Sequence, residues 1–161
     1  MKTAALTAKP KPAAKGFAWG GIVSAHIRGP KTKSAAALRD LPAVIGAVQA
    51  GLPFAEVEAL QAGLDLPLDK LAPKLGLSKA TLYRRKLEGR LTPAESDRVM
   101  RYARLLGRAV EVLEGEAAAR HWLTRPQYGL GGAIPLDYAE TEAGAREVEN
   151  VLGRIEYGVY S

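Results

Sequence analysis

From residue 40 onward, apolar residues recur at intervals of three and four, which is the spacing that places them on one face of an α-helix. No stretch alternates apolar and polar residues over the length of a β-strand. The pattern therefore predicts an all-α fold. The predicted helices cover residues 40–51, 53–63, 68–89 (two helices), 91–115, 116–123 and 141–158, and residues 128–136 (YGLGGAIPL) are predicted to be a glycine-rich loop.

Capping residues mark the ends of these predicted helices. Thr92, Pro93 and Glu95 have the spacing of a capping box with proline at the first helical position. An apolar face follows on the same helix, made of Val99, Tyr102, Leu105, Leu106, Val110 and Leu113. The other predicted caps are Asp40 and Thr141 at helix starts and Gly51, Gly63 and Gly158 at helix ends.

Residues 1–34 are rich in alanine, lysine, proline and glycine, as in the stretch AKPKPAAKG. A segment of this composition buries little apolar surface, so we predict a flexible basic tail. Residues 17–27 (FAWGGIVSAHI) form an apolar island within it. We expect this island either to dock on another surface or to form a transient strand.

Residues 68–89 (LDKLAPKLGLSKATLYRRKLEG) have the pattern of a helix-turn-helix. Gly76 would allow a positive φ in the turn, and Ser78 would cap the second helix by accepting from its free N–H groups. The residues predicted to face inward are Leu71, Ala72, Leu75, Leu77 and Leu82. Such a unit presents the N-terminal half of its second helix to the major groove of DNA.

The outward residues of that second helix are the candidate DNA contacts. Cations there would bind phosphates and make binding salt-sensitive, while Tyr83 and Arg84 could reach bases. We predict the DNA-binding residues to be Ser78, Lys79, Ala80, Thr81, Tyr83, Arg84 and Arg85. The alternative is a leucine-rich helical hairpin that only fills a domain. The spacing of its alanine, glycine, leucine and serine residues, together with the local excess of basic residues, favours DNA contact.

One position departs from the pattern. Three residues after Leu82 an apolar residue is usual, but the chain has Arg85 there. We expect Leu87 to take its place through a slight rotation of the helix.

The charge distribution along the chain also suggests two different partners. Residues 1–39 hold eight Lys or Arg and no acid, and residues 70–108 hold eleven basic residues against three acids. From residue 109 to 161 the balance reverses, with four arginines against nine acids. The basic part suits a polyanion and the acidic end suits an electropositive protein surface.

Several classes of chemistry lack the residues they need. The chain has no cysteine, and its two histidines, His26 and His121, are far apart in sequence, so we expect no metal site, no cofactor and no histidine-dependent catalysis. The pair Gly131–Gly132 is too short to cradle a phosphate. No apolar run is long enough to span a membrane, and no secretory signal is evident, so we expect a cytoplasmic protein that is not an enzyme.

The last forty residues carry a specific resemblance. The sequence has WL at residues 122–123, Pro126, LGG at 130–132, IPLD at 134–137 and TEAGAREVENVLGRIEYGVYS at 141–161. This combination resembles the toxin-binding domain of Xre/MbcA/ParS-type antitoxins, in which an Xre-like helix-turn-helix comes first, as residues 68–89 do here. The resemblance covers about residues 40–161.

The resemblance implies an antitoxin of a type II toxin–antitoxin system that neutralises a toxin and represses its own operon. It implies a RES-domain toxin that destroys or modifies NAD, operator DNA as the second partner, and a homodimer within a hetero-oligomer. The C-terminal end of the antitoxin would lie at the entrance of the toxin's active site. The expected organisation is a basic tail over residues 1–34, a DNA-binding domain over 35–108 and a toxin-binding domain over 109–161.

The end of the chain suits that role. Tyr157 and Tyr160 are good interface anchors, and Arg154 could form a bidentate pair. The predicted toxin-binding residues are Leu130, Gly131, Gly132, Arg154, Ile155, Tyr157, Gly158, Val159, Tyr160 and Ser161. A frayed terminus is the alternative for the last few residues, and Trp122 and Leu123 are expected in the core. For the whole protein, the alternative is a free-standing helix-turn-helix regulator whose C-terminal domain only dimerises.

Overall fold

The computed structural model describes residues 21–28 and 40–158. Its helices are α1 (Gly21–Arg28), α3 (Leu41–Ala50), α4 (Ala55–Leu64), α5 (Leu68–Lys74), α6 (Lys79–Glu88), α7 (Pro93–Leu113), α8 (Glu116–Leu123), the 3₁₀ turn η2 (Tyr128–Leu130), α9 (Pro135–Tyr138) and α10 (Glu142–Glu156). In these two ranges the only β pairing is an isolated antiparallel bridge between Pro53 and Arg90. The predicted all-α fold is confirmed.

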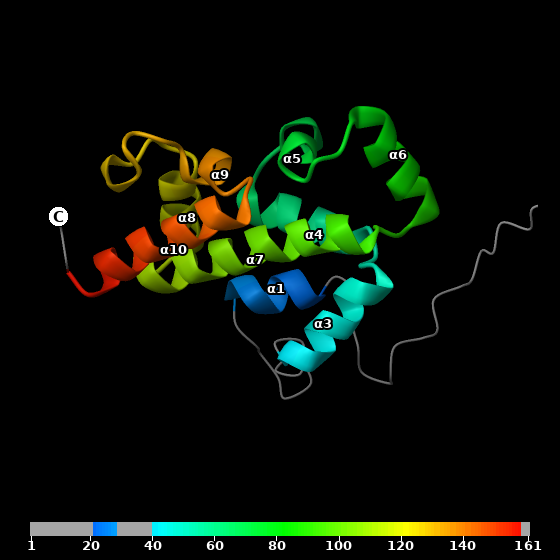
Figure 1. The fold of residues 1–161 in the computed structure, drawn as a ribbon, viewed down its shortest axis with the longest axis horizontal. Coiled ribbons are helices and arrows are strands. Elements are labelled where there is room, and N and C mark those ends of the chain that lie inside the picture. Colours follow the sequence, from blue (N-terminus) through cyan, green and yellow to red (C-terminus); the bar gives the residue numbers. More distant parts are fainter. Residues whose placement is uncertain (1–20, 29–39, 159–161) are drawn as a thin grey trace, which may run out of the picture.

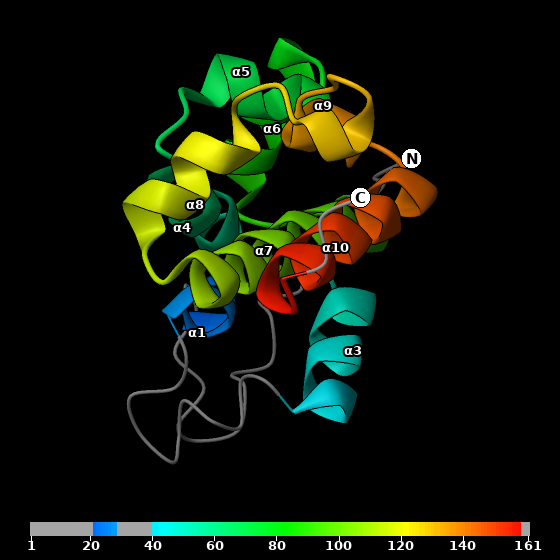
Figure 2. The same cartoon turned by 90° about the vertical axis from the view of Figure 1, so that its left-hand side faces the viewer.

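Helix α7 runs through the middle of the molecule and contacts helices from both halves of the chain. Helices α1 and α3 pack against α7 on the side drawn lower in Figure 1, and α10 lies alongside α7 (Figures 1 and 2). Helices α4 and α8 also pack against α7. The predicted boundary between residues 108 and 109 therefore falls inside a helix that both halves share.

The N-terminus of α7 is fixed by the predicted capping box. The Thr92 hydroxyl accepts from the Glu95 N–H at 3.3 Å, and the Glu95 carboxylate accepts from the Thr92 N–H at 2.9 Å. Pro93 occupies the first helical position, where its missing N–H costs no hydrogen bond. Because these signals lie within four residues of one another, the sequence predicted this end correctly.

One apolar core extends through the whole described molecule. Leu52 and Leu71, Leu105 and Leu106 of α7, and Leu152 of α10 all have no measurable exposure and belong to the same cluster. Trp122 packs against this cluster and Leu123 lies within it, as predicted.

A polar contact joins α7 to α9 inside this core. The Tyr102 hydroxyl donates to the carbonyl oxygen of Leu136 at 3.3 Å, and burial of the ring raises the pKa of Tyr102. The phenol therefore stays neutral and keeps its proton for this bond.

The prediction of a flexible tail over residues 1–34 is wrong for residues 21–28, which form α1 and enter the core. Ile22 and Val23 have no measurable exposure. Their N–H groups donate to the two carboxylate oxygens of Glu56, at 3.3 and 3.0 Å. A carboxylate at a helix N-terminus binds unpaired N–H groups and complements the helix dipole. The apolar island therefore docks as a helix, whereas residues 1–20 and 29–34 lie outside the described residues.

Two predicted helix ends differ in the structure. Gly63 does not end α4, which continues to Leu64 and stops where Asp65 adopts a left-handed φ of 53°. A Cβ on Gly63 would lie 2.7 Å from the Cδ1 atom of Ile27, so this glycine serves the approach of α1. Asp40 precedes α3 but makes no side-chain cap bond.

The last helix begins and ends close to prediction. The Thr141 hydroxyl accepts from the Gly144 N–H at 3.0 Å, and Gly158, with a φ of 66°, follows the final turn. The glycine-rich segment before it was predicted to be a loop, but it contains η2 and the start of α9, which bury Leu130 and Leu136.

Helix α1 approaches α7 closely at Gly107, where a Cβ would lie 1.9 Å from the carbonyl oxygen of His26. We expect Gly107→Ala to lower the free energy of unfolding by roughly 1–3 kcal/mol, because the methyl group must push α1 away. Urea unfolding of the full chain measures this effect.

Gly153→Ala is the matched control, since Gly153 is also helical and has nothing within 4 Å of its would-be Cβ. That variant should be neutral or more stable by up to about 1 kcal/mol. Equal behaviour of the two variants would contradict the packing of α1 on α7.

Candidate functional site

Helices α5 and α6 form the predicted helix-turn-helix, with the predicted residues inside. The inward residues and their exposed fractions are Leu71 0%, Ala72 3%, Leu75 0%, Leu77 6% and Leu82 5%. Leu82 is the member of this set on α6, and its burial fixes the inner side of that helix against the body of the molecule. The outer side of α6 is thereby left free for a partner.

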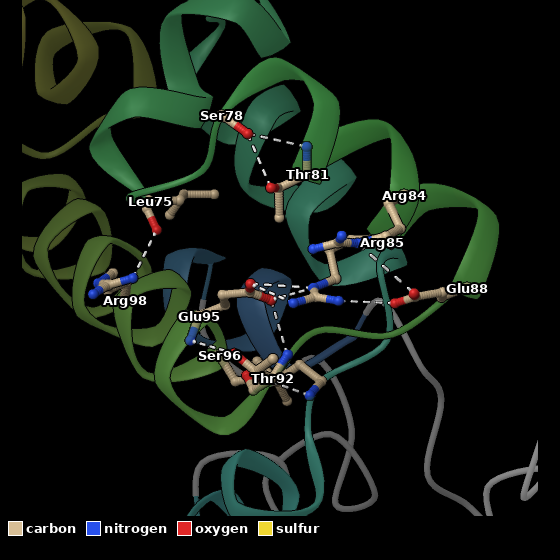
Figure 3. A network of polar contacts seen from close by, with 11 residues as sticks. Leu75, Ser78, Thr81, Arg84, Arg85, Glu88, Thr92, Glu95, Ser96 and Arg98 are labelled. Atoms are coloured by element: carbon tan, nitrogen blue, oxygen red, sulfur yellow. Dashed lines mark hydrogen bonds and ion pairs between the residues drawn. The ribbon is translucent and has the colours of Figure 1, made fainter. Parts of the chain in front are cut away.

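The turn between these helices depends on Gly76. Its φ is 69°, a conformation that residues with a Cβ rarely adopt. A Cβ there would lie 2.7 Å from Nη1 of Arg98, and this same nitrogen donates to the carbonyl oxygen of Leu75 at 3.2 Å (Figure 3). The glycine thus allows both the turn and the arginine that supports it from α7.

Ser78 caps α6 as predicted. Its hydroxyl oxygen accepts from the Thr81 N–H at 3.2 Å and its O–H donates to the Thr81 hydroxyl at 2.9 Å (Figure 3). Both side chains are therefore engaged in holding the helix start.

The outer side of α6 carries the other predicted DNA contacts. Lys79, Ala80, Tyr83 and Arg84 are all exposed, Tyr83 by 58% and the Arg84 side chain by 61%. Helix α6 projects from one end of the long axis of the molecule, away from the last helix (Figure 1). These four residues form a continuous accessible surface.

Arg85, also a predicted DNA contact, points inward in the structure. Its Nε donates to both carboxylate oxygens of Glu95 at 3.1 and 2.9 Å, and its Nη2 donates to Oε1 at 3.1 Å. Its Nη1 donates to Glu88 at 2.9 Å (Figure 3). The side chains of Arg85 and Glu95 are only 16% and 9% exposed. Arg85 thus lies in the position where an apolar residue was expected.

The expectation that Leu87 would take that position is wrong, because Leu87 is 90% exposed. A rotation that buried Leu87 would break the bonds between Arg85 and Glu95. The ion pair therefore decides which residues of α6 face outward.

The electrostatics of this pair favour the charged forms. Burial by itself raises the pKa of Glu95, but the hydrogen bonds from Arg85 and from Thr92 outweigh it and hold the pKa below its ordinary value. The hydrogen bonds to Glu95 and Glu88 raise the pKa of Arg85. Glu95 was predicted only as a capping residue, and its second role needed the structure.

The segment after α6 is also fixed to the body of the molecule. The Phe54 N–H donates to the carbonyl of Gly89 at 3.0 Å, and the Leu91 N–H donates to the carbonyl of Leu52 at 2.8 Å. The Ser96 hydroxyl accepts from the Leu52 N–H at 2.8 Å. Both ends of α6 are thus anchored.

The second candidate site lies at the end of α10. Helix α10 buries Ala145, Val148, Val151 and Leu152. Its last turn is held to α7 by Arg108, which forms ion pairs with Glu156 and with Glu111. Tyr157 follows and is 79% exposed. The end of α10 and helix α6 lie at opposite ends of the molecule (Figure 1).

The predicted toxin-binding residues differ in their accessibility. Leu130 is only 8% exposed, so its side chain belongs to the core. Gly131 and Gly132 are exposed with φ of 64° and 87°. The exposed or partly exposed members on α10 and after it are Arg154, which pairs with Glu147 at 3.4 Å, Ile155, Tyr157 and Gly158, while Val159, Tyr160 and Ser161 lie outside the described residues.

An ion pair between Lys74 and Asp137 joins the helix-turn-helix to the C-terminal half, since it connects the end of α5 to α9. Sixty-three positions separate these two residues, so no local pattern pointed to them. In the two described ranges, no group of three or more histidine, cysteine or acidic residues is placed to hold a metal ion. Nor does any helix there have the length and apolarity that crossing a bilayer requires.

Comparison with known proteins matches both halves of the chain. The sequence model of the antitoxin Xre-like helix-turn-helix domain matches residues 43–104, and that of the antitoxin Xre/MbcA/ParS C-terminal toxin-binding domain matches residues 108–158. A protein of Yersinia enterocolitica called antitoxin Xre is 33% identical over 141 residues, which are 82% of this chain and 95% of that protein. The chain belongs to the Xre antitoxin family.

Two further relatives agree with this assignment. An antitoxin Xre of Photorhabdus laumondii is 40% identical over 75 residues, 46% of this chain and 51% of that protein. A Prs ADP-ribosylating antitoxin of a Sphingobium species is 26% identical over 127 residues, 73% of this chain and 80% of that protein. This chain is therefore an antitoxin of a toxin–antitoxin system, and its partner is a cognate toxin.

In this antitoxin, the buried pair predicts a non-additive response to mutation. We expect Arg85→Met to lower the free energy of unfolding by about 3 kcal/mol, because it leaves the Glu95 carboxylate buried without its partner. The double variant Arg85→Met, Glu95→Gln should lie within about 1 kcal/mol of the wild type, since glutamine can keep the cap on Thr92. Urea unfolding of the full chain at neutral pH measures all variants.

The pH dependence of folding stability gives an independent test of whether the ion pair between Glu95 and Arg85 stabilises the protein. The pKa of Glu95 is lower in the folded protein than in the unfolded chain. The stability that the ionised carboxylate contributes is therefore fully present above the unfolded pKa and is lost as the pH falls through the folded pKa. The stability advantage of wild type over Glu95→Gln should therefore shrink in acid. An advantage that grows in acid would contradict the paired arrangement.

Proposed function

We propose that this antitoxin represses its own operon through α6 and blocks a RES-type, NAD-degrading toxin with the end of α10. The observation that carries the proposal is the separation of an exposed basic helix and an exposed tyrosine-bearing end at opposite ends of one core. Two partners can then bind the same molecule without competing for one surface.

Operator binding is supported by the outward face of α6. Lys79 and Arg84 are exposed on a helix of helix-turn-helix geometry, where phosphates and base edges are met. Two copies of the chain, each reading one half-site, would account for a homodimer within the complex. We propose residues 35–108 as the DNA-binding unit, acting on DNA in the cytoplasm.

Toxin blocking is supported by the end of α10. The toxin-binding sequence model covers this helix, and we propose residues 109–161 as the unit concerned. Tyr157 is exposed on a turn that Arg108 and Glu156 hold against α7, so little freedom is lost when the end of α10 enters a cleft. The RES class rests on the family resemblance. The Sphingobium relative is named for ADP-ribosylation, a reaction that consumes NAD, and this is compatible with such a toxin.

Removing the two exposed cations of α6 should separate the two activities. We expect Lys79→Ala, Arg84→Ala to weaken binding to the DNA upstream of its gene roughly 10- to 100-fold and to reduce the salt slope by about 2, since two phosphate or base contacts are lost. Protection of cells from the toxin should not change. Gel-shift titrations over a range of salt concentration and a growth assay with the toxin measure the two effects.

The charge-matched control is Arg125→Ala, Arg146→Ala, which removes two exposed arginines outside the helix-turn-helix, one after α8 and one on α10. It should keep its affinity for the DNA. Equal losses in both double variants would mean that net charge alone, rather than α6, governs binding.

A chain that ends at Glu156 should show the opposite effects to Lys79→Ala, Arg84→Ala. We expect it to bind DNA normally and to lose toxin neutralisation, because Tyr157 and the residues after it fill the cleft. Tyr83→Ala removes an exposed tyrosine at the other end of the molecule and should keep neutralisation.

The measurements are toxin activity on NAD with each purified variant and survival of cells that express the toxin. Full protection by the shortened chain would refute the blocking role. If deletion of this gene also left cells healthy, the free-standing regulator would be the better account.

A further inference from the structure

The outermost line of α6 is apolar. At about 100° per residue, Ala80 and Leu87 lie on nearly the same line of the helix, with Tyr83 directly beside it. This line is opposite the side that buries Leu82 and holds Arg85 against Glu95. Leu87 is 90% exposed and Tyr83 is 58% exposed.

Cations border this line on both sides. Lys79 and Lys86 lie along one edge, where they line a hollow with Leu68, Asp69, Leu82 and Tyr83. Arg84 lies along the other edge, with its Nε 4.0 Å from Glu88. The face is thus apolar in its centre and has three cations at its edges against two acids, Asp69 and Glu88.

This charge pattern favours DNA over a second copy of the chain as the occupant. Two copies that met through this face would bring like charges together. A major groove instead offers phosphates at both edges, which suit Lys79, Lys86 and Arg84. Between them lie the base edges, which must meet the apolar line.

Apolar side chains can recognise one group in the major groove. The 5-methyl group of thymine is the largest apolar group on the base edges, where most of the other groups are hydrogen-bond donors or acceptors. We propose that the line of Ala80, Tyr83 and Leu87, which extends the contact from the N-terminal half of α6 to its last turn, determines specificity by packing on thymine methyl groups of the bound duplex. This inference rests on the proposed DNA binding.

The methyl group can be removed from the DNA without changing base pairing, by replacing thymidine with deoxyuridine. We expect the full chain to bind the thymine duplex about 3- to 5-fold more tightly for each methyl group contacted. The probe is the segment that the protein protects upstream of its own gene, prepared in both forms, and affinity is measured by fluorescence anisotropy.

Three variants sharpen the test. Leu87→Ala should bind the thymine duplex more weakly and lose part of its preference over the uracil duplex. Lys79→Ala, Arg84→Ala should bind both duplexes more weakly but keep the preference, because it removes phosphate contacts. Leu41→Ala, which removes another exposed leucine, should behave as wild type.

The outcomes distinguish a failure of the thymine inference from a failure of the proposed DNA binding. Specific binding with equal affinity for both duplexes would overturn the thymine inference and leave the proposed repression intact. Absence of any sequence-specific binding would overturn both. If Leu87→Ala instead changes the oligomeric state of the free chain and leaves the base preference unchanged, the apolar line is a protein contact and the inference is wrong.

Discussion

The burial of α7 on both sides is the constraint on which the rest of the structure depends. Tyr102, Leu105 and Leu106 have no measurable exposure and pack among residues from both halves of the chain. No two independent cores exist within the described ranges, because one cluster extends from α1 to α10. Helix α6 and the end of α10 are therefore placed relative to each other by a single packed helix, without a linker between them.

Polar contacts then fix orientations that apolar packing leaves open. Leucine side chains tolerate small rotations of a helix, whereas the bonds from Arg85 to Glu95 have defined directions. They set the rotation of α6 and so place Leu87 outside. At the other end of the molecule, the ion pair between Arg108 and Glu156 holds the last turn of α10 against α7. In both cases a charged side chain holds a neighbouring helix, and of the two only Arg85 had been predicted to contact a partner.

Features that depend on neighbours in sequence were predictable. The capping box at Thr92, the Ser78 cap and the positive φ of Gly76 each involve atoms within a few residues, and all three are present. The helical periodicity likewise predicted the all-α class. The exposed face of α6 was predicted for Lys79, Ala80, Tyr83 and Arg84, but not for Leu87.

The amino-acid sequence by itself thus determined most of the helices, most of their ends and the helix-turn-helix pattern, because these follow from local hydrogen bonding and periodicity. Only the tertiary structure decided that residues 21–28 are part of the core, that Gly63 serves a neighbouring helix and that Arg85 faces inward. The physical reason is the distance along the chain between the groups involved. Glu56 binds N–H groups more than thirty residues away, and no local pattern specifies which distant partner a side chain meets.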